Sequence, residues 1–195
     1  MVYIDKLVCK GFKSFGRETV TIKLHPGFTC IVGPNGSGKS NVIDAILFVL
    51  GQLSAKTLRA NVFSDLLYSP PKPGMPPRAK SALVQLHFNN KDRKLPIDAD
   101  KVVIERELDE SGKSVCRVNG RVVTRTAVLD LLSSIGVDPN GYNLVLQGEI
   151  AQMVKVSPTD RRKLIEEIAG ISAYDEQKER ALKKLQESEA KELNP

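Results

Sequence analysis

The stretch GPNGSGKSNVIDAILFVLG (residues 33–51) decides the fold of this chain. Its first eight residues match the pattern G-x-x-x-x-G-K-[S/T] at every fixed position. Glycines let backbone N–H groups approach phosphate oxygens, and the start of the next helix adds its positive dipole end. FTCIVG (residues 28–33) is predicted to be a short buried strand before the loop, and residues 40–50 have helical spacing. We therefore predict the strand, loop and helix of a P-loop α/β fold.

Two side chains of this loop carry its chemistry. Lys39 can reach the β- and γ-phosphates of a nucleotide as a point charge, and Ser40 can offer its hydroxyl to Mg²⁺. The guanine-selecting N/T-K-x-D segment known from GTPases is not found, which favours ATP by resemblance. The sequence thus predicts a site for ATP and Mg²⁺.

The composition is that of a folded globular protein. In 195 residues, 41% are apolar and 27% charged, which favours one main domain with a small lobe or arm and argues against disorder. No apolar run approaches the roughly 20 residues of a membrane span, and the N-terminus has no signal-peptide pattern, so we expect a cytoplasmic protein. The net charge of +6 is compatible with nucleic acid but decides nothing alone.

The three cysteines do not suggest a disulfide or zinc framework. Cys9, Cys30 and Cys116 are widely spaced, odd in number and form no C-x-x-C pair. We expect three buried, reduced thiols.

The chain divides around a proline-rich loop, residues 69–79, which has five prolines in eleven positions. Before it, alternation predicts a strand, a loop and a second strand. After it, turn residues at 110–112 and 119–120 separate three antiparallel strands of a β lobe. A helix at about residues 126–135, a turn and a short strand at 143–148 follow.

The C-terminal part is predicted to be helical. Ser157 can cap a helix, and from Tyr174 opposite charges lie about four residues apart. Ala181, Leu182 and Leu185 form only a thin apolar seam. From these residues alone, a coiled coil and a solvated surface helix remain equally good interpretations.

The groups that hydrolysis requires beyond the phosphate loop are missing. Mg²⁺ should also be held by an acidic residue at the end of an apolar strand. VVIERE (residues 102–107) is better explained as an outer hairpin strand, and VLDLL (residues 128–132) has a helical pattern. Gln147 is either a metal or water ligand or only a capping group. The sequence therefore supplies half of a nucleotide site, and the rest must come from more chain or another chain.

Several separated motifs together resemble one family. They are GFKSFG (11–16), GPNGSGKSNVIDAILFVLG (33–51), LSAKTLRA (53–60), GYNLVLQGEI (141–150) and DRRKLIEEIAGISAYDEQK (160–178). In this order they resemble the N-terminal part of an SMC (structural maintenance of chromosomes) protein of the bacterial or archaeal type. The resemblance covers essentially the whole chain.

The resemblance implies an ABC-type ATPase half head with an antiparallel β lobe over residues 1–170. Residues 171–195 would begin a coiled-coil arm, which we expect to be cut short at Pro195. The Walker B strand, catalytic glutamate and signature motif would lie in a C-terminal half. Two heads would sandwich ATP, and the implied partners are a second head, a kleisin subunit and double-stranded DNA, without a membrane. The implied place is the cytoplasm, on the nucleoid, in chromosome condensation and segregation.

The resemblance also assigns residues. Nucleotide phosphates would be surrounded by Gly33, Pro34, Asn35, Gly36, Ser37, Gly38, Lys39, Ser40 and Asn41, with Lys13 and Ser14 approaching from GFKSFG. Ser40 and Gln147 would hold Mg²⁺, Gln147 now being a Q-loop ligand, and Lys39 and Gln147 would serve catalysis. Arg59 matches the family's arginine loop, implicated in DNA-stimulated hydrolysis, and Lys56 lies nearby. Lys56, Lys72, Arg78 and Lys80 could add a phosphate-binding face, although scattered basic residues are more often only a solvated surface.

Three alternatives remain open. A zinc-hook ATPase of double-strand-break repair would have a C-x-x-C hook in its middle region. An ABC transporter ATPase would have all its motifs in one continuous domain. A binding module gated by nucleotide would show no turnover.

Overall fold

The computed structural model describes residues 2–70, 78–137 and 162. The chain divides into two compact units, Met1–Asn140 and Gly141–Pro195. The fold below is that of the first unit. The expected strand at 143–148 with Gln147, the helices after Ser157 and the start of the arm near residue 171 lie outside the described residues.

Within the described residues, one antiparallel sheet has the strand order β2-β1-β3-β4-β5-β6. Its strands are β1 (Tyr3–Lys10), β2 (Val20–Lys23), β3 (Ser81–Asn89), β4 (Lys101–Asp109), β5 (Ser114–Val118) and β6 (Arg121–Val123). Gly112, Asn119 and Gly120 have φ values of 82°, 48° and 79°, the left-handed conformation that tight hairpins need. The predicted antiparallel β lobe is confirmed, and 102–107 lies in β4 as an antiparallel strand.

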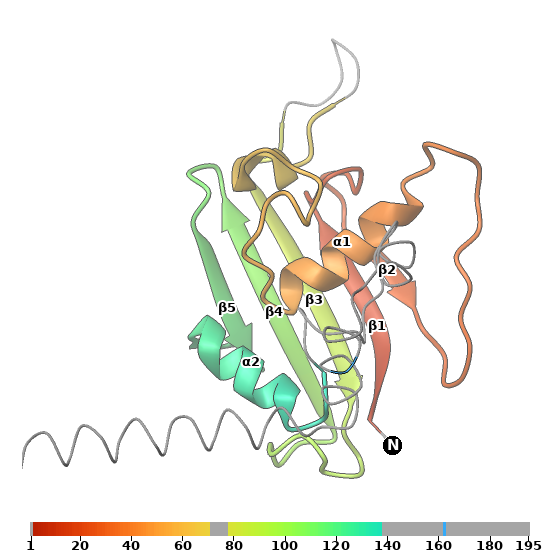
Figure 1. Cartoon of the computed structure of the whole chain (residues 1–195), viewed down its shortest axis with the longest axis vertical. Coiled ribbons are helices and arrows are strands. Elements are labelled where there is room, and N and C mark those ends of the chain that lie inside the picture. Colours follow the sequence, from red (N-terminus) through yellow and green to blue (C-terminus); the bar gives the residue numbers. More distant parts are fainter. Residues whose placement is uncertain (1, 71–77, 138–161, 163–195) are drawn as a thin grey trace, which may run out of the picture. The chain divides into compact units, whose positions relative to one another are not determined.

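The core lies on one face of this sheet. Buried and half-buried residues alternate along β3 and β4, as a strand with one face on a core requires. Helix α1 (Lys39–Val49) covers that face and buries Leu47 and Phe48 against it (Figure 1). Helix α2 (Arg125–Ser133) packs near β5, and Thr124 caps it by accepting a hydrogen bond from the Ala127 N–H at 3.2 Å. The helices predicted at residues 40–50 and at about 126–135 are confirmed.

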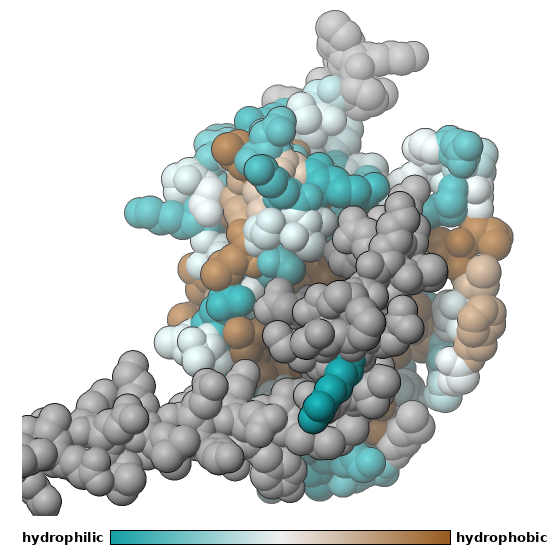
Figure 2. All heavy atoms as spheres, in the orientation of Figure 1, coloured by the Kyte–Doolittle hydropathy of each residue, from teal (hydrophilic) through white to brown (hydrophobic). Residues whose placement is uncertain are grey.

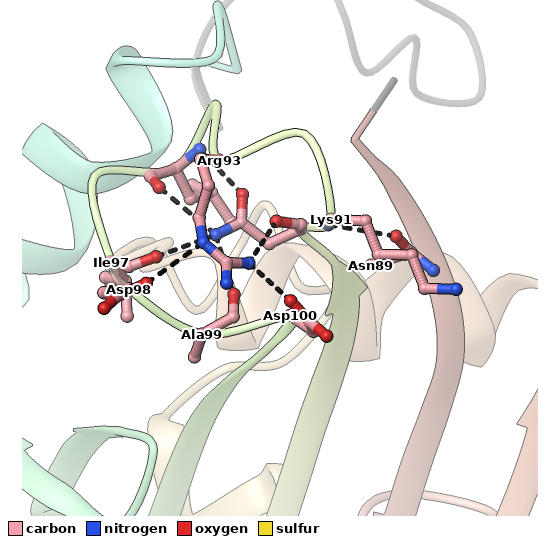
Figure 3. A network of polar contacts seen from close by, with 9 residues as sticks. Asn89, Lys91, Arg93, Ile97, Asp98, Ala99 and Asp100 are labelled. Carbon is pink, nitrogen blue, oxygen red and sulfur yellow. Dashed lines mark hydrogen bonds and ion pairs between the residues drawn. The ribbon is translucent and has the colours of Figure 1, made fainter.

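The loop between β3 and β4 is held by polar contacts rather than by regular structure. The buried Asn90 side chain donates to the backbone carbonyls of Leu95, Ile97 and Ala99. Arg93 donates to Asp98 at 3.2 Å and to Asp100 at 2.6 Å (Figure 3). Each buried amide hydrogen thus has a partner. These polar contacts add to the burial of Leu95, which is 0% exposed, at this end of the sheet.

The prediction of a buried strand at residues 28–33 is wrong. The segment has no strand conformation, and Phe28 and Val32 are 93% and 84% exposed. It forms part of the long loop between β2 and α1 in Figure 1, with apolar atoms on the surface in Figure 2. The physical reason is that a strand needs neighbouring strands for its N–H and C=O groups, and the described residues provide none beside it.

The cysteine prediction is correct for two residues and wrong for the third. Cys9 and Cys116 are buried and free, whereas Cys30, in the same loop as Phe28, is free and exposed. Cys30 is exposed because residues 28–33 have no neighbouring strand among the described residues. Among the described residues, no helix has the length and apolarity that crossing a membrane requires.

Candidate nucleotide-binding site

The glycine loop is shaped by positive φ angles and a close approach. Gly36 and Gly38 have φ values of 79° and 90°, and Gly38 is the N-cap residue directly before α1. A Cβ at Gly38 would lie 2.8 Å from the Ser14 hydroxyl oxygen. A side chain at Gly38 would therefore be strained by its φ angle and would displace the Ser14 hydroxyl.

Lys39 folds back over this loop. Its ammonium group donates to the carbonyls of Gly33 and Pro34, each at 2.7 Å. An ammonium has three N–H donors, so one remains for a further acceptor. The charge is thereby fixed at the mouth of the loop, where a phosphate oxygen would complete its hydrogen bonds.

The N-terminal turn of α1 is free of negative charge. It contains Lys39, Ser40 and Asn41, and no acidic side chain lies in it. The unpaired backbone N–H groups and dipole of a helix start favour an anion. Together with the glycine conformations and the spare Lys39 donor, this donor set fits a nucleotide phosphate.

Asp44, the carboxylate of α1, forms ion pairs with two cationic side chains. Lys13 donates to its Oδ2, and Arg59 donates to Oδ2 at 2.5 Å and to Oδ1 at 3.2 Å. The Asp44 side chain is only 4% exposed, and the Lys13 ammonium also donates to the Leu58 carbonyl. The loops that carry Lys13 and Arg59, distant in sequence, thus both contact the Asp44 carboxylate. Its buried negative charge therefore has the positive partners that burial requires.

Asn41, one turn before Asp44, connects the same loops. Its amide nitrogen donates to the Ser14 hydroxyl at 2.7 Å, and its Oδ1 accepts from Arg59 at 3.1 Å. The structure therefore brings Lys13, Ser14 and Arg59 together near the start of α1, and their roles toward a nucleotide or DNA stay predictions.

The backbone at Lys13 and Arg59 is in the left-handed region, with φ values of 46° and 52°. Such angles are uncommon outside glycine and cost energy that the surroundings must offset. Lys13 is also fixed by its N–H, which donates to the Leu66 carbonyl at 2.7 Å. Both side chains are aimed at Asp44 by constrained turns.

The other end of α1 is held by two arginines that sequence reasoning missed. Arg106, only 2% exposed, donates from one nitrogen to the carbonyls of Phe48 at 2.9 Å and Gln52 at 2.8 Å. Arg125 donates to the Gly51 carbonyl at 2.6 Å. Positive charge at a helix C-terminus offsets the negative end of the dipole.

Arg106 also packs against aromatic rings, with its guanidinium carbon 4.5 Å from the Phe48 ring centre and 5.3 Å from that of Phe63. Burial lowers the pKa of Arg106. The alternation of β4 was a usable signal for it. Because Ile104 and Leu108 face the core, position 106 between them must face it too.

The remaining predicted residues are only partly brought to this site. Lys56 and Arg59 line an open pocket together with Ala60, Asn61 and Asp65. Arg78 donates to the Ser64 carbonyl, and Lys72 and Gln147 lie outside the described residues. In the described part of the chain no group of three or more His, Cys, Asp and Glu residues could hold a metal ion. Ser40, in the first turn of α1, stays the predicted Mg²⁺ ligand among the described residues.

Sequence comparisons agree with the geometry. The family described as "RecF/RecN/SMC N terminal domain" matches residues 3–157. The chain is 52% identical over 189 residues to the chromosome partition protein Smc of Pyrococcus furiosus, covering 97% of this chain and 16% of that protein. It is 45% identical over 189 residues to that of Aquifex aeolicus, with the same coverage of 97% and 16%. The chain spans about a sixth of the length of these relatives.

Solved structures give the same likeness. The Smc head domain of Pyrococcus furiosus, with an extended coiled coil and bound to the C-terminal domain of ScpA, has a TM-score of 0.84 and 52% identity. That match covers 97% of this chain and 47% of the other. A chain solved in work on ATP-driven dimerization and DNA stimulated activation of SMC ATPases has a TM-score of 0.79 and 53% identity. It covers 85% of this chain and 99% of that chain.

Proposed function

Because the chain belongs to the RecF/RecN/SMC N-terminal domain family, we propose that it is the ATP-binding N-terminal half of an SMC ATPase head. Its fold is part of such a P-loop, ABC-type head, with the antiparallel β lobe described above. With a C-terminal half and a second head, it would hydrolyse ATP and drive the engagement and release of heads that organise chromosomal DNA. The expected place is the cytoplasm, on the nucleoid.

The observation that carries this proposal is the gathering of cations at the start of α1. Lys39, Lys13 and Arg59 surround a helix N-terminus whose nearest carboxylate is Asp44. Three positive charges against one negative charge leave a net positive field where the glycine loop presents its N–H groups. A triphosphate is strongly anionic and fits this surplus of donors.

The chain's own residues would divide the work of binding. Gly33–Asn41 backbone and side-chain donors would hold the phosphates, Lys39 would contact the β- and γ-phosphates, and Lys13 and Ser14 would close one side. Ser40 would hold Mg²⁺, with Gln147 as a second ligand in our proposal. Bound Mg²⁺ would neutralise charge on the phosphate oxygens.

The exposed segment at residues 28–33 supports the need for a second half. This segment is apolar, leads into the phosphate loop and has no neighbouring strand among the described residues. Such exposure is expected when the strand that would pair with it belongs to another part of the protein. We therefore propose that a C-terminal head half pairs with it and brings the Walker B acid and signature motif.

The other partners are proposed from relatives. ATP-driven dimerization is described for SMC ATPases and ScpA binding for the Pyrococcus furiosus head. We accordingly propose a second head and a kleisin of the ScpA kind for this chain, and double-stranded DNA as its substrate. The curated relatives are chromosome partition proteins, which favours this assignment over a zinc-hook repair ATPase.

ATP turnover after reconstitution tests the proposal. This chain is mixed with the C-terminal head half, and phosphate release is measured with and without DNA. We expect turnover from the mixture, almost none from either half, and none with Lys39→Ala. Full activity of this chain alone would refute the half-site model, and ATP binding without turnover by the mixture would favour a nucleotide-gated binding module.

A further inference from the structure

A second cluster of positive charge lies on the other side of the loop that approaches the nucleotide site. A pocket is lined by Lys10, Gly11, Arg17, Ala79, Lys80 and Ser81, and is called the cationic pocket below. Lys10 ends β1, Arg17 follows the loop 11–16, and Lys80 precedes β3. Three cations thus converge from two segments far apart in sequence, and no acidic side chain lines the pocket.

Among the described residues, these three cations have no counter-charge. The side chains of Lys10, Arg17 and Lys80 are exposed, and none forms a hydrogen bond or ion pair with the part of the chain that the structure describes. Other basic residues in this unit are engaged, for example Arg59 with Asp44 and Arg117 with Glu105. Neighbouring like charges repel one another, so an anion in the pocket would be favoured.

We propose that the cationic pocket binds phosphate groups of the double-stranded DNA backbone. The lining offers positive charge and backbone but no aromatic ring on which a base could stack. Contacts of that kind position DNA without reading its sequence. The inference rests on the proposed function, since it gives the head's DNA partner a place on this chain.

The pocket is connected to the nucleotide site by one short loop. The Gly11 N–H donates to the Gly16 carbonyl at 2.7 Å and closes the loop at its base, beside Lys10 and Arg17. The tip of the same loop carries Lys13, which reaches Asp44 on α1. A DNA phosphate at the base of the loop and a nucleotide near its tip would therefore both lie next to residues 11–16.

This loop is held at its base by hydrogen bonds and by close packing against β3. The Tyr68 N–H donates to the Gly11 carbonyl at 2.7 Å. A Cβ on Gly11 would lie 2.3 Å from the Ser81 carbonyl oxygen, which shows how closely β3 approaches. DNA stimulated activation is described for SMC ATPases. In this proposal, DNA bound at the cationic pocket causes part of that stimulation of ATP turnover.

The test compares two triple variants of the complete head. One carries Lys10→Gln, Arg17→Gln and Lys80→Gln. The control carries Lys91→Gln, Lys94→Gln and Lys101→Gln, which remove the same charge at the opposite end of β3 and β4. Binding of a fluorescent DNA duplex is measured by anisotropy over a range of KCl concentrations.

Each lost phosphate contact should flatten the slope of log K against log salt by about 0.9. We expect the pocket variant to flatten it by about 2 to 3 and the control by less than about 1. Equal slopes in the two variants would overturn the proposal. Lys80→Gln alone, outside the loop, should flatten the slope by about 1 and serves if the triple variant unfolds.

ATP turnover separates this proposal from the function on which it rests. The pocket variant should keep its rate without DNA and lose most of the DNA stimulation, while the control keeps both. If the unaltered head shows no turnover, the proposed function fails. If it turns over ATP and the pocket variant responds to DNA like the control, only the cationic pocket is refuted.

Discussion

Arg59 binds both carboxylate oxygens of Asp44, at 2.5 Å and 3.2 Å, and shares that carboxylate with Lys13. Arg59 is half exposed, whereas Asp44 is buried. The arginine is therefore positioned by a fixed partner while part of its guanidinium stays open to solvent. Asp44 lies one turn beyond Lys39 and Ser40, so the pair connects the loop that carries Arg59 directly to the helix that follows the glycine loop.

Asp44→Asn should lower both the stability and the ATP turnover of the assembled head. The substitution leaves Lys13, whose side chain is 11% exposed, without a counter-charge. Breaking a buried pair commonly costs about 3–5 kcal/mol, and we expect about 2–4 kcal/mol here because Arg59 is half exposed. Urea unfolding and phosphate release measure the two effects.

A double-mutant cycle assigns the Asp44 effect to the pair. Arg59→Ala should cost much less in the Asp44→Asn background than in the unaltered head, because its partner is already gone. Asp130→Asn, at an exposed position of α2, is the control and should change little. Fully additive effects of the two substitutions would show that the pair does not act as a unit.

Arg106→Ala should strongly destabilise the assembled head. It removes the donor to the Phe48 and Gln52 carbonyls and leaves a cavity beside two rings. Large buried truncations and lost buried partners cost about 3–5 kcal/mol. Arg106→Lys keeps the charge but not the planar fork, so it should lose about 1–3 kcal/mol. Arg121→Ala, exposed on β6, should stay within about 0.5 kcal/mol in urea unfolding.

The sequence predicted those elements whose signals are local. The hairpins of the β lobe follow from alternation and from turn residues such as Gly112, and α1 follows from its glycine loop and apolar spacing. The segment at 28–33 was mispredicted because a strand depends on neighbours that the described residues do not contain. The phosphate loop could be named residue by residue, since its pattern is contiguous.

The contacts that position the site could not be read in the same way. Asp44 was not singled out by the sequence, because its meeting with Lys13 and Arg59 depends on how two distant loops approach α1. Arg106 is different, because the alternation of β4 already placed it on the core face. Its partners, however, lie more than fifty residues earlier in the chain and only the fold brings them together.

Cys30 should react with a maleimide or a disulfide reagent much faster than the other thiols. Cys30 is exposed, whereas burial protects Cys9 and Cys116 and raises the pKa of Cys9 to about 12. At pH 8 such a thiol is ionised to only about one part in ten thousand, and the thiolate is the reactive form. Mass spectrometry after brief labelling gives the three rates.

The same labelling reports on the missing strand neighbours. Adding the C-terminal head half should slow the reaction of Cys30, because residues 28–33 would gain a paired strand and become buried. Albumin at equal concentration is the control for nonspecific protection. An unchanged Cys30 rate in a mixture that hydrolyses ATP would contradict the pairing of this segment.

His87, on the outer face of β3, should make the head less stable in mild acid. Partial burial, followed by the charge of Lys6, lowers the pKa of His87 below its ordinary 6.5; the charge of Asp5 acts in the opposite direction, and Lys101 adds a further lowering effect. In the window between the lowered pKa and about 6.5 the unfolded chain binds more protons than the folded one. The contribution of neutral His87 to the free energy of unfolding is therefore fully present above pH 6.5. It is lost as the pH falls through this window.

The variant His87→Gln isolates that contribution. Unfolding free energies of the head are measured in urea between pH 5 and pH 8, and the variant should lose less stability on acidification than the unaltered protein. His25→Gln, at an exposed loop position after β2, corrects for the loss of a histidine as such. If His87→Gln and the unaltered head lose stability in parallel below pH 6.5, then the His87 imidazole is not held in its neutral form by the sheet.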